Sequence, residues 1–252
     1  MQIDQFMALA KRRRSIRRFK PDPVPEEYVE KVLETGRWAM SGANAQPWEL
    51  IVVRNKETIG KLANAYFEDR RQFYEIEQSL PEDLRHLQLV NPPGMPTFKD
   101  APVLIVICGD RRTVQATVLA ANFLHGDGGT GSVFIANIAN VTQMIHLAVA
   151  ALGLGSQWVT VNRINEEPMK DILGVPNVLE LHTIVPIGYP SYQAAIAYRR
   201  ERQEFVHYEK YNRSLLRSGA EVVNYIRKLR NKTKTAYRPE REVEKKGGKQ
   251  IE

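Results

Sequence analysis

One short run, residues 103–108 (VLIVIC), constrains the fold most. Six consecutive apolar residues, mostly β-branched, are typical of a strand buried on both faces of a sheet. Residues 48–53, 156–161 and 181–187 are also rich in strand-forming side chains. Helical periodicity marks residues 3–12, a segment after Pro25, and residues 56–66, 113–124 and 133–152. This alternation favours one α/β or α+β domain.

The single cysteine, Cys108, limits the chemistry available to the 252-residue chain. One thiol excludes an internal disulfide, an iron–sulfur cluster held by the chain and any zinc site with two thiolates. Cys108 belongs to the apolar run, so we expect a core residue rather than a nucleophile. The five histidines show no paired metal-ligand spacing, and no G-x-S-x-G elbow is present. A cofactor is therefore expected to supply the chemistry.

Most of the net charge of +7 comes from the C-terminal end. Residues 227–252 hold ten Lys or Arg and four Glu, which leaves about +1 for the rest of the chain. Because this end has almost no large apolar residues after Leu229, we expect residues 213–252 to form a basic, extended or disordered arm. A solvated tail is favoured over a nucleic-acid-binding arm.

A second basic cluster falls between Lys11 and Lys20, where seven of ten residues are cationic. Such a density suggests that an anion neutralises part of it. A solvent-facing helix end is an equally good explanation, because cations also favour the negative end of a helix dipole.

The glycines at positions 126, 128 and 131 match the dinucleotide pattern G-x-G-x-x-G. That pattern requires a strand directly before it, whereas residues 118–124 predict a helix. A flexible turn is therefore favoured. No continuous apolar run approaches the roughly 20 residues of a membrane span, and residues 1–10 lack the features of a secretory signal. We expect a cytoplasmic protein without membrane contact.

Five segments, in order and spacing, resemble the nitroreductase-like flavoprotein family. They are residues 13–19, 41–48, 101–102, 151–156 and 187–190. The resemblance spans roughly residues 5–212. It implies an α+β fold in which helices flank a mixed sheet, an intertwined homodimer, and a first domain over residues 1–212. It does not explain the insert at residues 67–98, which we interpret as a possible lid.

The resemblance also implies non-covalent FMN and a set of residues that bind it. Arg13, Arg14, Ser15 and Arg17 would hold the phosphate, the ribityl chain and the pyrimidine edge, because guanidinium groups match phosphate oxygens. The remaining candidates are the basic pair Arg199 and Arg200, the loop residues Ser41, Gly42, Ala43, Asn44 and Gln46, and the strand-end residues Thr160 and Val161 near flavin N5. In the family, the loop approaches the flavin from the other subunit. Met40 replaces the family's usual proline.

The expected function is therefore that of an FMN-dependent oxidoreductase. NAD(P)H would reduce the flavin, and a flat acceptor such as a nitroaromatic or a quinone would then bind in the same slot, in ping-pong order. Two alternatives come from the same family: flavin fragmentation, and reductive dehalogenation with a lid, for which Glu68, Tyr74, Glu75, Glu77 and Lys99 are candidates. An alternative of another class is a basic binding module without catalysis.

Overall fold

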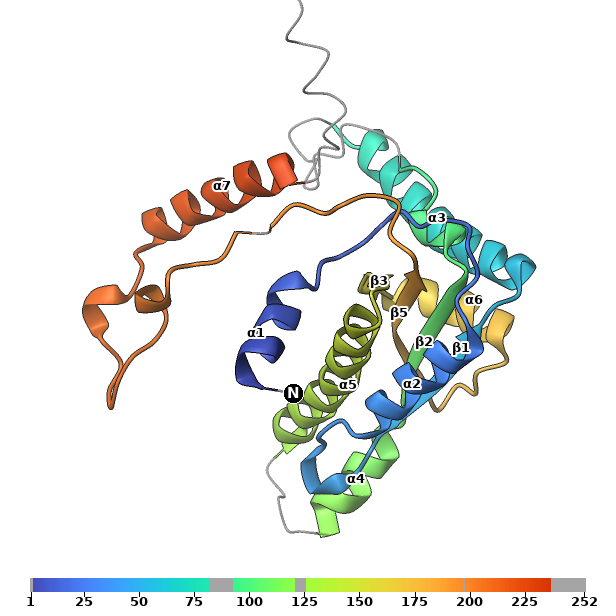
Figure 1. Ribbon diagram of the computed structural model, residues 1–252, viewed down its shortest axis with the longest axis horizontal. Coiled ribbons are helices and arrows are strands. Elements are labelled where there is room, and N and C mark those ends of the chain that lie inside the picture. The colour runs from blue at the N-terminus through green and yellow to red at the C-terminus, as the bar shows by residue number, and fades with distance from the viewer. Residues whose placement is uncertain (1, 82–92, 121–125, 197, 237–252) are drawn as a thin grey trace, which may run out of the picture. The chain divides into compact units, whose positions relative to one another are not determined.

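The computed structural model describes residues 2–81, 93–120, 126–196 and 198–236 (Figure 1). The chain groups into two compact units, Met1–Ser191 and Tyr192–Glu252. The end of the expected first domain, residues 192–212, thus groups with the second unit. Each unit is described below by itself.

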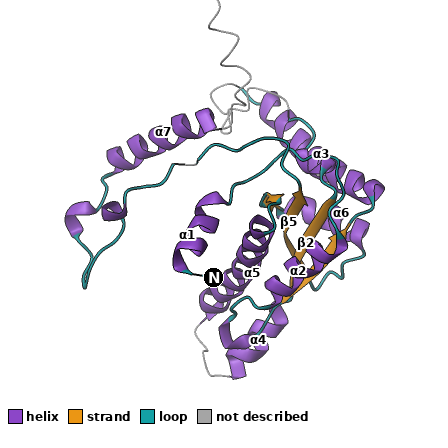
Figure 2. Cartoon of the chain, viewed as in Figure 1, coloured by secondary structure: helices purple, strands orange, loops and turns teal. Residues whose placement is uncertain are grey.

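One antiparallel sheet forms the centre of the first unit (Figure 2). Its strands, in spatial order, are β1 (Trp48–Val53), β2 (Val103–Gly109), β5 (Glu180–Gly188) and β3 (Gly155–Ser156), and β4 (Val159–Thr160) also pairs with β5. Residues 156–161, predicted as one strand, form two short strands instead. Ser15 adds a single parallel bridge to Ser156. The expected α+β class is confirmed.

Helices cover both faces of this sheet. They are α1 (Ile3–Arg12), α2 (Glu26–Arg37), α3 (Lys56–Ser79), α4 (Arg111–Ala120), α5 (Gly126–Ala151) and α6 (Arg163–Leu173), with 3-10 turns at Gly42–Asn44 and Thr97–Asp100. Strand β2 is buried along its whole length, as predicted. Val103, Ile105 and Ile107 pack with α2 and α5, and the alternating residues face the side of α3 and α6. Burial raises the pKa of Cys108 to about 12, so this thiol is a core residue.

Helix α5 begins at Gly126, so the glycine-rich stretch forms its first turns. The flexible turn expected at residues 126–131 is wrong. Glycine costs about 1 kcal/mol per helical position, but helix extension is cooperative and the apolar helix that follows is firmly packed. Among the described helices, α5 alone contains a stretch, Ser132–Ala151, with the length and hydropathy of a membrane span. More than half of this stretch is buried within the protein, as is usual for a core helix.

Helix α3 is longer than predicted and takes in the first part of the insert. It continues to Ser79 rather than ending near residue 66. Asp69 and Glu77 are buried there, with 6% and 5% of their surface exposed. Because polar residues occupy the buried face, the apolar periodicity that reveals a helix is missing from the sequence. Residues 82–92 of the insert lie outside the described residues.

The second unit contains two 3-10 turns, Arg202–Glu204 and Arg213–Leu215, and helix α7 (Gly219–Ala236). Helix α7 contradicts the extended arm expected for this region. The sequence signal for its start is a capping box: Glu221 accepts a hydrogen bond from the Ser218 amide (2.7 Å), and Ser218 Oγ accepts one from the Glu221 amide (3.3 Å). The rest of the basic tail, residues 237–252, lies outside the described residues.

Candidate functional site

Residues 13–19, here called the arginine segment, run along the edge of the sheet at β3. The Ile16 amide donates to the Ser156 carbonyl at 2.8 Å, and Phe19 forms a bridge with Pro190. Gly155 permits this approach, because a Cβ atom there would lie 2.7 Å from the Ile16 side chain. Glycine at position 155 thus permits the arginine segment to lie directly against β3.

Arginine side chains of this segment lie half-buried at the β3 edge. Those of Arg13, Arg14 and Arg17 are partly covered, and that of Arg18 is exposed. Arg14 donates through one terminal nitrogen to the carbonyls of Arg13 (2.8 Å) and Lys11. Its Nε is buried and finds no hydrogen-bond partner among the described residues. A buried guanidinium N–H that lacks an acceptor is costly, so an anionic oxygen fits this place.

Arg12, by contrast, has a structural role. It lies at the end of α1 and donates to the carbonyl of Ala150 in the last turn of α5, at 3.1 Å. A cation at a helix C-terminus satisfies a carbonyl that lacks a helical partner and favours the helix dipole. The helix-end explanation of the basic cluster thus holds for Arg12, and the anion expected at the other arginines stays a prediction.

Strand β4 pairs with β5, the same strand that pairs with β3 at the arginine segment. Thr160 is exposed and pairs with Thr183, whereas Val161 is buried and donates its amide to the His182 carbonyl at 3.2 Å. Helix α6 starts directly afterwards, with Asn162 as its N-cap. Asn165 is the partner of Asn162 in a capping box, and its Oδ1 accepts from the Asn162 amide at 2.9 Å. The strand end therefore has a fixed backbone.

A buried histidine on α5 supports this region, and the sequence reasoning missed its role. His146 is 5% exposed, and its Nδ1 lies 2.7 Å from Ser156 Oγ. The Trp158 ring stacks on it with a centroid separation of 6.2 Å. Burial, together with the charge of Arg13, lowers the pKa of His146 to about 4, so the ring is neutral at physiological pH. The signal in the sequence was a lone ionisable residue in an apolar helix.

The loop of residues 41–46, here called the strained loop, has an unusual backbone. Ala43, Asn44 and Gln46 have φ values of 52°, 53° and 43°, a region that residues with a side chain rarely adopt. Ser41 Oγ accepts from the Gln46 amide at 3.1 Å, and the Gln46 side chain donates to the Asn44 carbonyl at 3.3 Å. Asn44 and Gln46 therefore already stabilise the loop itself. Strain of this kind concentrates at functional sites.

Helix α5 holds the strained loop through two asparagine side chains. Asn137 Oδ1 accepts a hydrogen bond from the Gly42 amide at 3.0 Å, and Asn140 donates to the Met40 carbonyl at 3.0 Å. A Cβ atom on Gly42 would lie 2.8 Å from Val133, so a larger residue would push the loop away. The absence of a side chain at Gly42 and its hydrogen bond to buried Asn137 thus set the position of the loop.

The arginine segment and the strained loop lie at different places along α5. Arg12, which directly precedes the segment, reaches Ala150 in the last turn, and Gly42 contacts Asn137 near the middle of the helix. Thirteen residues separate Asn137 from Ala150, which corresponds to about 20 Å along a helix. One chain therefore does not bring the two predicted groups of FMN-binding residues together.

Arg199 and Arg200 belong to the second unit. Arg199 donates to the Tyr198 carbonyl at 2.9 Å, and the Arg200 guanidinium lies 5.1 Å from the Phe205 ring. These contacts hold the two side chains locally. Their predicted part in a phosphate clamp stays a prediction.

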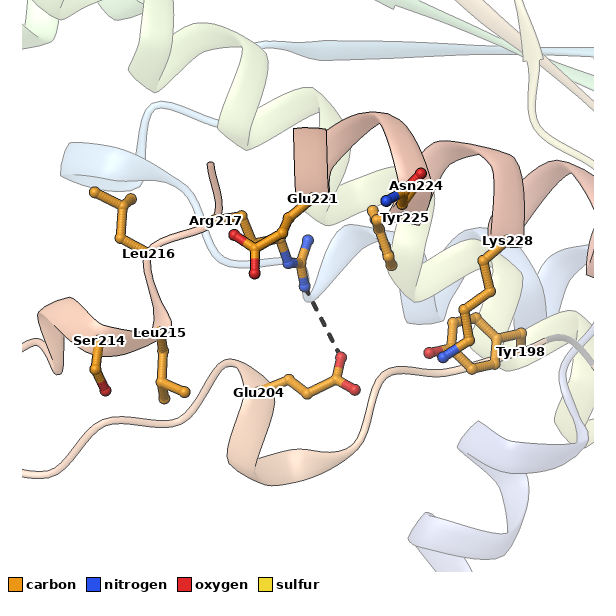
Figure 3. A pocket seen from close by; sticks show the side chains of 10 residues that line it. All are labelled: Tyr198, Glu204, Ser214, Leu215, Leu216, Arg217, Glu221, Asn224, Tyr225 and Lys228. Atoms are coloured by element: carbon orange, nitrogen blue, oxygen red, sulfur yellow. Dashed lines mark ion pairs between the residues drawn. The ribbon is translucent and has the colours of Figure 1, made fainter. Parts of the chain in front are cut away.

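A cavity of about 370 Å³ lies within the second unit, between the start of α7 and the chain before it (Figure 3). Its charges are largely compensated, because Glu204 faces Arg217 at 3.8 Å and Arg217 lies over the Tyr225 ring at 4.2 Å. Lys228 likewise lies over the Tyr198 ring, at 5.1 Å. None of the predicted site residues lines it.

The residues considered for a dehalogenase lid do not converge in the described part of the insert. Glu68 and Glu75 share one face of α3, where both pair with Arg71. Glu77 lies on the buried face, and Lys99 pairs with Asp100 at 2.6 Å. The charges of Glu68, Glu75 and Lys99 are compensated locally instead of facing a common ligand.

Comparison with known proteins gives several matches. The chain is 29% identical to an NADH dehydrogenase of Thermus thermophilus, over 75% of this chain and 89% of that protein. It is 28% identical to an iodotyrosine deiodinase of Thermotoga neapolitana, over 72% and 87%. A solved structure of an FMN-dependent nitroreductase from Clostridium difficile has the same fold, with a TM-score of 0.60, 24% identity and coverage of 81% and 99%.

The match to a family profile covers most of the first unit. Residues 10–189 fit the profile of the nitroreductase family, from the end of α1 to the turn after β5. These residues include the arginine segment, the strained loop and the whole sheet. The chain is a member of the nitroreductase family.

Proposed function

We propose that this protein is an oxidoreductase that binds FMN in a site shared between two copies of the chain. The observation that carries the proposal is the half-buried guanidinium of Arg14 beside β3, whose Nε has no acceptor among the described residues. A phosphate oxygen matches this donor, and Arg13, Ser15 and Arg17 offer further donors on the same segment. The FMN-dependent nitroreductase of similar fold supports this choice of cofactor.

When bound, FMN supplies the redox chemistry, taking up a hydride from NAD(P)H and returning electrons to an acceptor. The chain's own residues bind and orient it. The guanidinium groups favour negative charge at the pyrimidine edge, which makes reduction easier. Thr160 is exposed at the end of β4 and is available as a hydrogen-bonding group, whereas Val161 is buried and its amide already donates to the His182 carbonyl.

The shared site follows from the separation of these two regions along α5. A two-fold axis that pairs α5 with its copy in antiparallel orientation brings the strained loop of one protomer to the arginine segment of the other. Helix α5 has a suitable surface, an exposed or partly exposed stripe at helical spacing. The stripe comprises Ser132, Ile135, Ala139, Gln143, Leu147 and Ala151. Ile135 is 50% exposed in the single chain, which a subunit contact would cover.

The acceptor is proposed to be a flat, oxidised molecule such as a nitroaromatic or a quinone, reduced in ping-pong order after NAD(P)H. The printed name of the Thermus relative, NADH dehydrogenase, supports a nicotinamide donor. The deiodinase relative favours reductive dehalogenation as a second candidate. Anaerobic assays with a nitroaromatic, a quinone and 3-iodotyrosine separate the candidates, because each product has a distinct mass.

A complementation experiment tests the shared site. Arg14→Ala removes the phosphate contact and Gly42→Val displaces the strained loop, so each homodimer should retain little FMN. In a refolded mixture, about half of the dimers carry one variant of each kind, and each of these has one intact site. FMN capacity should therefore return to about one quarter of the wild-type value. A mixture that binds no more FMN than either variant alone would contradict a site shared between subunits.

A further inference from the structure

His146 is the one ionisable side chain that is buried between α5 and the arginine segment in the described structure. Its Nδ1 lies 2.7 Å from Ser156 Oγ, and both side chains are almost completely buried, at 5% and 2% exposed. A hydrogen bond in such a place has no competition from water, so losing one partner leaves the other unsatisfied. This bond joins the helix to the short strand β3.

Ser156 is the residue through which β3 holds the arginine segment. Its carbonyl accepts from the Ile16 amide at 2.8 Å, and it forms the bridge with Ser15. Two residues further on, Trp158 stacks on the His146 ring, and Thr160 follows at the end of β4. His146 therefore touches the chain on both sides of Gln157, between the arginines and the strand end.

A two-residue strand with one parallel bridge is a weak register device by itself. We propose that His146 is a positioning residue which, through Ser156, fixes the register of the arginine segment against β3 and so sets the spacing between the phosphate-binding arginines and the end of β4. The inference rests on the proposed FMN site, and it adds a residue outside the segments of family resemblance that is needed to shape this site.

The charge state of His146 is consistent with this role. The ring is neutral because it is buried and because Arg13 is nearby. A neutral imidazole offers one donor and one acceptor, which allows a specific bond with a hydroxyl without adding charge to the arginine segment. An anion bound by Arg13 would offset part of the charge of Arg13 and raise the pKa of His146.

Flavin titration of His146 variants tests the proposal. His146→Leu keeps the volume but removes the bond, so FMN should bind about tenfold more weakly. Riboflavin keeps the ribityl chain and the pyrimidine edge but lacks the phosphate, and should lose less than about threefold, because the strongest charge-assisted contacts of the arginines are those to the phosphate. His146→Asn keeps a hydrogen-bonding group near the Nδ1 position and should recover most of the FMN affinity.

A matched control lies one turn earlier on the same helix. Thr142 is fully buried, and its hydroxyl donates to the Ile138 carbonyl within α5 at 2.7 Å. Thr142→Val should lower the melting temperature but leave the ratio of FMN to riboflavin affinity unchanged. If His146→Leu does not fold, Ser156→Ala removes the same bond from the other side and should change that ratio in the same direction.

NMR titration gives a second readout that does not depend on turnover. The His146 ring should titrate near pH 4 in the free protein, and the midpoint should rise when FMN is added. Equal losses for FMN and riboflavin, no rescue by His146→Asn, or an unmoved midpoint would each overturn the positioning role. If wild-type protein binds neither flavin, the proposed function itself fails.

Discussion

The two halves of the proposed site, the arginine segment near the last turn of α5 and the strained loop near its middle, are built differently. At the arginine segment the backbone is regular: none of the residues 13–19 has a positive φ, and hydrogen bonds to β3 and to the chain after β5 hold it. At the strained loop, three of six residues have a positive φ. The arginine segment presents side-chain charge on an ordinary backbone, and the strained loop presents an unusual backbone with few charges. Binding of the phosphate and shaping of the ring site are thus assigned to separate structures.

The largest expected effect comes from removing charge from the arginine segment. Arg14→Ala should weaken FMN binding by about 30- to 100-fold, because a partly buried, charge-assisted hydrogen bond is lost. Fluorescence titration of the apoprotein measures this. Lys20→Ala is the matched control: it removes a cation from the same part of the chain, but Lys20 is exposed. If the two variants bind FMN equally well, the phosphate assignment is wrong.

At the strained loop, the largest effect is expected from removing the side chain of α5 that binds the Gly42 amide. Asn137→Ala leaves the Gly42 amide without its acceptor and should cost about 1–2 kcal/mol in the free energy of unfolding. FMN binding should weaken as well, since the loop loses its anchor. Urea denaturation and FMN titration measure the two effects.

Asn140→Ala provides the comparison for that result. Asn140 donates to the Met40 carbonyl, but this contact is accessible to water, which can replace the lost donor. Its loss should therefore cost clearly less than the loss of Asn137. Equal effects of the two variants would mean that the hydrogen bond between Gly42 and buried Asn137 does not determine the position of the loop.

The sequence predicted the elements that follow apolar patterns. Strand β2, the core position of Cys108 and most of α5 agree with the prediction because burial selects apolar residues directly. The longer α3 and the helical α7 were missed, since their turns are fixed by polar residues such as Asp69 and the Ser218–Glu221 cap. Local pattern says little about such contacts.

For the site, the sequence located the residues but not their arrangement. Family resemblance marked Arg14 and Ala43, while the separation of their two regions along α5 requires the fold. His146 and Asn137 were not predicted as support, because a lone polar residue in an apolar helix does not reveal its partner. Ser156 and Gly42, the groups they bind, are distant in the sequence from these helix positions.

A smaller effect is expected from Asp69 of α3, which contacts the helix that follows Thr160. Burial raises the pKa of Asp69, which accepts from Asn165 of the α6 capping box at 3.4 Å. The folded state binds this proton more tightly than the unfolded state, so the stability it contributes is present below pH 3.8 and is lost as the pH rises above that value.

Asp69→Asn removes that loss and keeps an acceptor for Asn165. The gain in free energy of unfolding over wild type should be larger at about pH 7 than at about pH 3, and no more than about 1 kcal/mol. Urea denaturation at the two pH values measures it. A gain that does not change with pH would show that ionisation of Asp69 does not lower the free energy of unfolding. FMN affinity should stay the same, because Asn162 still caps α6.

The smallest expected effect tests whether the strain in the loop has a function. Glycine adopts a φ of 52° without steric cost, so Ala43→Gly should stabilise the protein by about 0.5–1 kcal/mol. If the strained backbone is retained because it shapes the flavin site, the same variant should bind FMN more weakly, since glycine also permits other conformations. Stability and affinity would then move in opposite directions, whereas a substitution at the arginine segment lowers affinity without raising stability. Thermal unfolding and FMN titration of the one variant decide the point, and a rise in both quantities would mean that the positive φ values are incidental to binding.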